Sequence, residues 1–269
     1  MTSEKAKFAL KVRFSGQSVE EKGVDLYDGS TSLWGFAQAL QIVVHAYING
    51  EVVSRATALK GGEMYIGAPR RGSLLFDIIT LIEQYPVSAG IAGAAFYDFV
   101  KFSLSKAAGL LGQKPETNSV QKKLEIDETF FDLLAETLEG SLQRAHRAID
   151  HGVTKITLER PRSELVTFNQ STSEWVNTRE EDATVREYTG NITRYNSISR
   201  NGRAYIRELG RVLPFRPASE FPEAKRGFLT WSLHGDNIAT QKELKIWASS
   251  IDSARGDTKR LVLFDCVAI

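Results

Sequence analysis

The first part of the chain shows two hydrophobic periods in succession. Residues 8–14 place an apolar side chain at every second position with Lys and Arg between them, which predicts a half-buried strand. Residues 33–50 repeat apolar side chains every three or four positions, follow the turn-like stretch "YDGSTS" and end at Asn49-Gly50. This spacing, with hydroxyl residues before it as N-caps, predicts an amphipathic helix.

A loop rich in glycine and arginine separates two apolar segments between Arg55 and Glu83. The segment after the loop, "SLLFDIITLI", is a continuous apolar run, which fits a buried strand or the start of a helix. Its β-branched residues, Ile78, Ile79 and Thr80, favour a strand. The two segments are therefore expected to pair.

Residues 86–112 form the longest apolar stretch, and a bilayer span needs about 20 apolar residues. Asp98, Lys101 and Lys106 interrupt this stretch. The pattern therefore favours an amphipathic helix that is buried or faces a partner. Contact with a membrane stays open as an alternative.

A further helix is predicted from Asp127, a suitable N-cap, to Gly152. Residues 153–183 are mostly polar and connect to the next part, although "VTKITLE" and "ELVTF" fit short strands. From residue 184 the pattern becomes that of strands, with Asn201-Gly202 as a two-residue hairpin turn and "GFLTWSLHG" among the later strands.

About five strands in the last 85 residues or so predict a small β-barrel, OB-like or SH3-like. The expected fold class is α+β. An N-terminal α+β domain with three main helices covers residues 1–152, a connecting segment covers 153–183, and the barrel covers 184–269.

Composition places the chain among globular proteins, with 42% hydrophobic and 25% charged residues. The formal net charge is +1, and the second part of the chain is mildly basic, with 18 Lys and Arg against 15 Asp and Glu in residues 151–269. Cys266 is the one cysteine, so no disulfide forms within the chain and a reducing compartment is expected. The first residues lack the pattern of a signal peptide, so the expected location is the cytoplasm.

The loop "GAPRRGS", residues 67–73, has the glycine spacing of a phosphate-binding P-loop. Ser73 occupies the place of the P-loop lysine and Leu74 the place of the magnesium-binding hydroxyl, which disfavours a nucleotide triphosphatase. The ordinary interpretation is a hairpin tip with solvated arginines. The alternative is an anion or partner contact by Arg70, Arg71 and Ser73, because the guanidinium group suits phosphate and carboxylate.

Candidate catalytic groups are few. Glu139, His146 and Asp150 fall on about the same helical face and are conceivable metal ligands, but solvated charges on a helix explain them as well. No G-x-S-x-G, H-E-x-x-H or C-x-x-C motif occurs. The sequence therefore predicts no catalytic residue, no metal site and no cofactor, and it favours a protein that is not an enzyme.

Arginines are concentrated at the start of the predicted barrel. Residues 186–216 contain seven arginines and two acids, Glu187 and Glu208. If "GRAYIREL" is a strand, Arg203, Tyr205 and Arg207 share one face, and Arg194 lies on the preceding strand. Arginines beside an exposed aromatic ring are typical of surfaces that bind single-stranded nucleic acid. The alternative is a solvated barrel face.

The order of these elements resembles a family of two-domain proteins. The stretches "LWGFAQALQ", "GSLLFDI", "GNITRYNSISRNGRAYI", "LPF" and "KRLVLFDC" are similar to those of a widespread set of uncharacterised bacterial and phage proteins. The resemblance implies an N-terminal α+β domain, a small C-terminal barrel and a link to mobile elements and anti-phage defence. It implies no activity.

The function expected first is a non-enzymatic binding or assembly module that associates with a protein partner or with itself in a larger complex. The second hypothesis is binding of nucleic acid or a nucleotide by the arginine and tyrosine face of the barrel. The third is perturbation of a membrane through residues 86–112.

Overall fold

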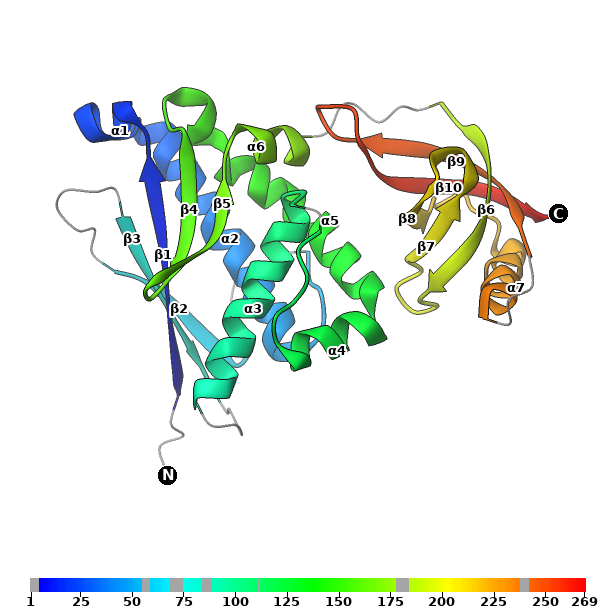
Figure 1. Ribbon diagram of the computed structural model, residues 1–269, viewed down its shortest axis with the longest axis horizontal. Coiled ribbons are helices and arrows are strands. Elements are labelled where there is room, and N and C mark those ends of the chain that lie inside the picture. The colour runs from blue at the N-terminus through cyan, green and yellow to red at the C-terminus, as the bar shows by residue number, and fades with distance from the viewer. Residues whose placement is uncertain are drawn as a thin grey trace. The chain divides into compact units, whose positions relative to one another are not determined.

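The protein is described here by a computed structural model (Figure 1). The structure describes residues 5–54, 59–67, 75–83, 89–110, 112–177, 184–237 and 242–269. The chain divides into two compact units, Met1–Val176 and Asn177–Ile269. The expected α+β fold class with a C-terminal barrel is confirmed.

The first unit is built on a five-stranded sheet with the order β2-β3-β1-β4-β5. Neighbouring strands all run antiparallel. The bounds are Ala6–Ser15 for β1, Gly62–Ile66 for β2, Leu75–Ile82 for β3, Lys155–Arg160 for β4 and Ser163–Phe168 for β5. The strands expected over residues 8–14 and after the glycine-rich loop are thereby confirmed, as β1 and β3.

Helices α2, α3 and α5 form the main helical layer of this unit (Figure 1). Leu10 and Val12 of β1, at alternate positions, are fully buried in one core with apolar side chains of these helices. The helices of the unit are α1 (Gln17–Lys22), α2 (Leu26–Asn49), α3 (Ala89–Ala107), α4 (Asn118–Ile126), α5 (Glu128–Ala145), the 3-10 helix η1 (Arg147–His151) and α6 (Gln170–Val176). The expectation of three main helices is confirmed.

Helix α2 begins earlier than the sequence predicts. Asp25 caps it, because its Oδ1 atom accepts hydrogen bonds from the backbone N–H groups of Tyr27 and Asp28. The stretch "YDGSTS" is therefore the first part of the helix, and its interpretation as a turn is wrong. An Asp cap with an acid in the first turn favours a helix start at this earlier position.

Residues 153–176 complete the first unit. The sequence assigned 153–183 to a connection, whereas the structure places β4, β5 and α6 in this stretch and pairs β4 with β1. Phe14 of β1 lies opposite Ile156 of β4, and both side chains are buried. Long-range pairing of this kind covers apolar side chains that a polar connection would leave in water.

The second unit is a closed five-stranded barrel with the order β10-β8-β7-β6-β9. Its strands are β6 (Arg186–Tyr195), β7 (Gly202–Ile206), β8 (Arg211–Pro217), β9 (Leu244–Asp252) and β10 (Thr258–Ala268). Two 3-10 helices, η2 (Arg207–Leu209) and η3 (Glu223–Lys225), and the helix α7 (Arg226–Asn237) follow strands of the barrel. Strands β8 and β10 pair in parallel, and α7 lies between the third and fourth strands, beside β6 (Figure 1). This is the arrangement of an OB-like barrel, one of the two expected types.

The expected two-residue turn at Asn201-Gly202 is wrong. The connection between β6 and β7 spans residues 196–201, and Gly202 is the first residue of β7. A Cβ atom on Gly202 would lie 2.4 Å from the Phe215 ring. The glycine therefore serves close packing inside the barrel, where the sequence pattern indicated a turn.

The strand expected over "GFLTWSLHG" is also wrong, because these residues belong to helix α7. Leu229 and Ser232 are three positions apart and fully buried. The Ser232 hydroxyl accepts a hydrogen bond from Ile192 N and donates one to Lys242 O. This polar anchor fixes the helix against β6, and a short apolar segment alone does not reveal it.

Candidate functional site

The glycine- and arginine-rich loop connects two strands, as expected. Strands β2 and β3 pair antiparallel, with Ile66 opposite Ile78. The candidate residues Arg70, Arg71 and Ser73 lie outside the described residues. Their interpretation as an anion or partner contact stays a prediction.

The other candidate residues lie in the barrel, with Arg194 on β6, Arg203 and Tyr205 on β7, and Arg207 directly after β7. Along β7, Ala204 and Ile206 are fully buried, whereas Arg203 and Tyr205 alternate with them and point outward. Arg203 lies opposite Arg194 of β6 and Pro214 of β8. We call the outward residues of these strands the Arg/Tyr face: Asn191, Arg194, Arg203, Tyr205, Val212 and Pro214.

Tyr205 occupies the next row of the Arg/Tyr face. It lies opposite Asn191 of β6 and Val212 of β8, and the exposed fractions of Tyr205 and Val212 are 39% and 37%. The Tyr205 side chain is therefore partly exposed beside a row with two arginines. Sequence reasoning missed Asn191, Val212 and Pro214, because their place in the face depends on the register between strands.

The two arginines of the first row are cross-strand neighbours. A β-bulge between Ile192 and Arg194 brings Arg194 directly opposite Arg203. Like charges in such a pair disfavour the sheet.

The two acids of this part of the chain are engaged elsewhere. Glu187 forms an ion pair with Lys245 of β9 at 2.9 Å. Glu208 accepts a hydrogen bond from the backbone N–H of Thr189 at 2.8 Å. The six residues of the Arg/Tyr face are basic, aromatic, apolar or amide residues. One carboxylate lies beside them, because Asn191 Nδ2 donates a hydrogen bond to Asp236 Oδ1 of α7 at 2.9 Å.

Arg207 is separate from the Arg/Tyr face. Strand β7 ends at Ile206, and Arg207 begins the 3-10 helix η2. Its guanidinium group forms an ion pair with Glu243. The structure therefore brings Arg194, Arg203 and Tyr205 together and places Arg207 beyond the end of the strand.

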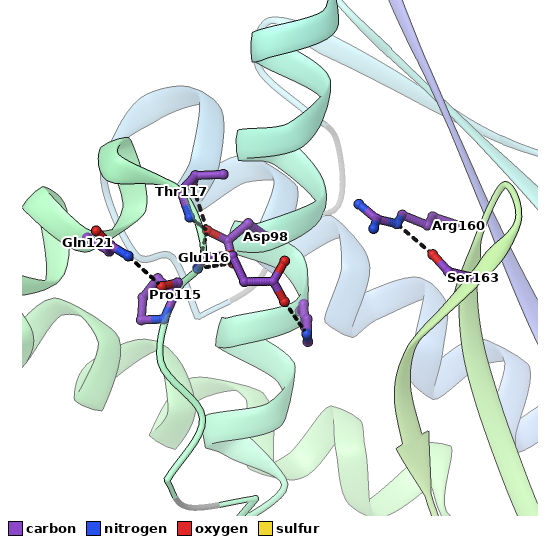
Figure 2. Close-up of polar contacts among 8 residues, drawn as sticks. Asp98, Pro115, Glu116, Thr117, Gln121, Arg160 and Ser163 are labelled. Atoms are coloured by element: carbon purple, nitrogen blue, oxygen red, sulfur yellow. Dashed lines mark hydrogen bonds and ion pairs between the residues drawn. The ribbon is translucent and has the colours of Figure 1, made fainter.

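The N-terminal unit contains a buried carboxylate, Asp98 of α3 (Figure 2). Its oxygens accept hydrogen bonds from Glu116 N at 3.0 Å, Thr117 N at 2.7 Å and Thr117 Oγ1 at 2.6 Å. Lys101 donates to Glu116 at 2.5 Å, and this contact, helped by the field of Arg160, lowers the pKa of Glu116. These hydrogen bonds hold the residues just before α4, so they give Asp98 a structural role.

Of the three conceivable metal ligands, the structure describes the side chains of Glu139 and His146. His146 is buried, with Nδ1 2.7 Å from Leu142 O and Nε2 2.9 Å from Thr172 Oγ1. The side chain of Asp150 lies outside the described residues. Within the described ranges no group of three or more His, Cys, Asp or Glu side chains is arranged to hold a metal ion.

Helix α3 contains most of the described part of the apolar stretch 86–112. Phe96, Phe99 and Leu104 of this helix are buried in the core of the first unit. No helix in the described part of the chain has both the length and the apolar character needed to cross a bilayer.

Comparison with known proteins identifies the first unit. A family described as "Domain of unknown function (DUF7946)" matches residues 10–177, more than half of the chain. No curated protein and no solved structure matches the chain. The matched range agrees with the first compact unit and leaves the barrel outside it. The chain belongs to the DUF7946 family, whose domain forms its N-terminal unit.

Proposed function

We propose that the protein binds single-stranded nucleic acid on the Arg/Tyr face of its C-terminal barrel. The observation that carries the proposal is the cross-strand pair Arg194–Arg203 with the exposed ring of Tyr205 in the adjacent row. Guanidinium groups neutralise phosphates, and an exposed aromatic ring stacks on a base of any sequence.

The position of this face supports the proposal. Strands β7 and β8 are the second and third strands of an OB-like barrel, and this surface binds oligonucleotides in many barrels of that type. The side chains on these strands support the proposal more directly than the fold does, because a fold alone does not imply a function. Val212 and Pro214 add apolar surface beside the ring, which suits bases and sugars better than a free ion.

This proposal is a specific form of the non-enzymatic binding module expected from the sequence, and it names single-stranded nucleic acid as the bound partner. A single-stranded ligand is favoured over a duplex, because the bases of a duplex are stacked on each other and are not free to stack on Tyr205.

The test is binding of a fluorescently labelled 15-nucleotide single strand, measured by anisotropy at salt concentrations from 50 to 200 mM. Each phosphate contact contributes a slope of about −0.7 to the dependence of log affinity on log salt for single strands. Two arginine contacts therefore weaken binding about sevenfold over this range.

Two matched variants distinguish a contact on the Arg/Tyr face from a general effect of the protein's positive charge. Arg203→Ala is expected to reduce both affinity and slope, whereas Lys22→Ala, which removes a charge from α1 in the other unit, leaves both unchanged. Absence of binding at 50 mM salt, or equal effects of the two variants, contradicts the proposal.

A second candidate function is association with a protein through α2. Trp34 is 55% exposed and Tyr27 is 71% exposed, and the guanidinium group of Arg144 lies 4.7 Å from the Trp34 ring. Trp, Tyr and Arg are the residues most enriched at the centres of protein interfaces. Self-association through this surface predicts a native mass above that of the monomer, reduced by Trp34→Ala in light-scattering measurements. A monomer at all concentrations contradicts it.

A further inference from the structure

The described sheet of the first unit has two edge strands, β2 and β5, and they differ in what they expose. Strand β5 has a bulge in its pairing with β4, and its apolar side chains are buried. Strand β2 pairs with β3 in a regular register, and its residues Tyr65 and Ile66 are 53% and 59% exposed. A regular edge strand with exposed apolar side chains is a site at which another strand can add.

The free edge of β2 presents the backbone groups of alternate residues. Gly67 N donates to Asp77 O, and Glu83 N donates to Gly61 O, so the odd-numbered residues bond to β3. In an antiparallel pair, residues that bond to the neighbouring strand alternate with residues that face away from it. The backbone groups of the three even-numbered residues therefore point to the free edge: Gly62, Met64 and Ile66.

A second copy of the chain fits this edge best in one antiparallel register. When Met64 lies opposite Met64 of the partner subunit, all five residues of β2 pair, and Glu63 lies opposite Tyr65 of the partner subunit. A shift by one step in either direction shortens the pairing. One of these shifts also places Glu63 opposite Glu63 of the partner subunit, and like charges in a cross-strand pair disfavour the sheet.

The apolar side chains match in the register centred on Met64. Ile66 lies opposite Gly62 of the partner subunit, on the face of the sheet that the helices cover. A Cβ atom on Gly62 would lie 3.1 Å from Ile48 Cδ1 and 3.8 Å from Leu59 Cδ1. Because glycine has no side chain, the exposed Ile66 can pack against this apolar surface of the second copy, which removes it from water.

The polar side chains on the other face of the sheet match as well. The Tyr65 hydroxyl donates to Glu63 Oε2 within one chain at 3.0 Å, and the pair that faces it across the two strands has the same two residue types. Lys5 Nζ lies 3.0 Å from Glu63 Oε1, so this carboxylate has a counter-charge in its own chain. The two glutamates of a dimer are therefore compatible with each other.

We propose that the free edge of β2 joins two copies of the chain through an antiparallel β2–β2 pair, with Met64 at the two-fold axis. A two-fold axis makes the contact surface the same on both copies. The dimer is independent of the proposed binding of nucleic acid. A pair of five-residue strands is a small interface, so the dissociation constant is expected to be about 10–100 μM.

Disulfide cross-linking tests the register in the full chain. In the proposed pair, residues 63 and 65 of opposite copies have Cα atoms about 4.5 Å apart, whereas two copies of residue 63, or two of residue 65, are diagonal neighbours about 7–8 Å apart. A disulfide bridges the first distance and not the second. A mixture of the Glu63→Cys and Tyr65→Cys variants is therefore expected to cross-link at least about fivefold more than either variant alone.

The control for cross-linking is the wild-type protein, whose thiol, Cys266, is buried and is expected to form no link. A mixture that cross-links no more than the single variants overturns the inference. Efficient cross-linking of Tyr65→Cys alone shows a different register and overturns it as well.

Light scattering at protein concentrations up to about 100 μM tests the surface itself. Ile66→Lys places a charge among apolar side chains of the second copy, so the dissociation constant is expected to rise at least about tenfold. Trp34→Ala, on helix α2, is the matched control and leaves the dimer intact. A wild-type monomer at the highest concentration overturns the inference. Dissociation by Trp34→Ala and not by Ile66→Lys assigns the contact to α2, which also overturns it.

Discussion

Replacement of Tyr205 by alanine isolates the contribution of the aromatic ring to binding. The ring lies on β7 between Asn191 and Val212, with 39% of the residue exposed. Stacking of one base on an aromatic side chain contributes about 1–3 kcal/mol. Tyr205→Ala is therefore expected to weaken binding of a 15-nucleotide strand by about 5- to 150-fold.

The cost of this variant to the fold is small by comparison. The aromatic ring and Val212 form a cross-strand pair, and such pairs contribute about 0.2–1 kcal/mol relative to alanine. For a domain of this size that corresponds to a fall of a few degrees in melting temperature. A binding assay at 20 °C therefore compares two folded proteins.

The assay is fluorescence anisotropy at 50 mM salt, with Tyr205→Phe as the matched control. Phenylalanine keeps the ring and removes the hydroxyl, so its affinity is expected to stay within about threefold of the wild-type value. An affinity of Tyr205→Ala within twofold of wild type would refute the stacking argument. Equal losses in both variants would assign the contact to the hydroxyl group instead of the ring.

Three further predictions concern the fold. Asp98→Asn replaces a carboxylate that accepts hydrogen bonds from two backbone N–H groups and one hydroxyl group, so the free energy of unfolding in urea is expected to fall by about 2–4 kcal/mol. Glu116→Gln is the milder control, and equal stability of Asp98→Asn and the wild-type protein would contradict the structural role. Gly109→Ala places a Cβ atom 2.2 Å from the Trp175 ring, at a residue with a φ of 73°. The free energy of unfolding is therefore expected to fall by at least about 2 kcal/mol, with a shift of the tryptophan fluorescence spectrum. An unchanged spectrum would count against this packing. Burial raises the pKa of Cys266 to about 11, which lowers the fraction of reactive thiolate at pH 8. Reaction with a thiol reagent at this pH is therefore expected to be about 200-fold slower in the native protein than in denaturant. Comparable rates in the two conditions would show an exposed thiol.

The local sequence pattern was enough to predict helices and strands whose apolar face can be recognised without knowing which element they pack against. The alternation in residues 8–14 and the spacing in 33–50 gave a strand and a helix, because burial on one face is encoded within each segment. The position of β1 in the middle of its sheet could not be predicted in this way. Its pairing with β4 joins residues about 146 positions apart, as in the Arg13–Glu159 ion pair.

The candidate site was predictable along one strand and not across strands. The alternation in "GRAYI" indicated that Arg203 and Tyr205 share a face. The position of Arg194 opposite Arg203 depends on a bulge in β6, and the contribution of Val212 depends on the register of β8. Arg207 departs from the face because the chain turns into η2 one residue after β7 ends.

The central position of β1 also affects how the first unit is made. On the ribosome β1 is synthesised about 140 residues before β4, a delay of roughly 10–30 s at ordinary elongation rates. During that time one edge of a strand rich in apolar side chains has no partner, which is the situation in which nascent chains need chaperones. A gene fragment that stops at codon 152 would make this exposure permanent, so expression of the first unit alone requires a boundary at Val176 or later.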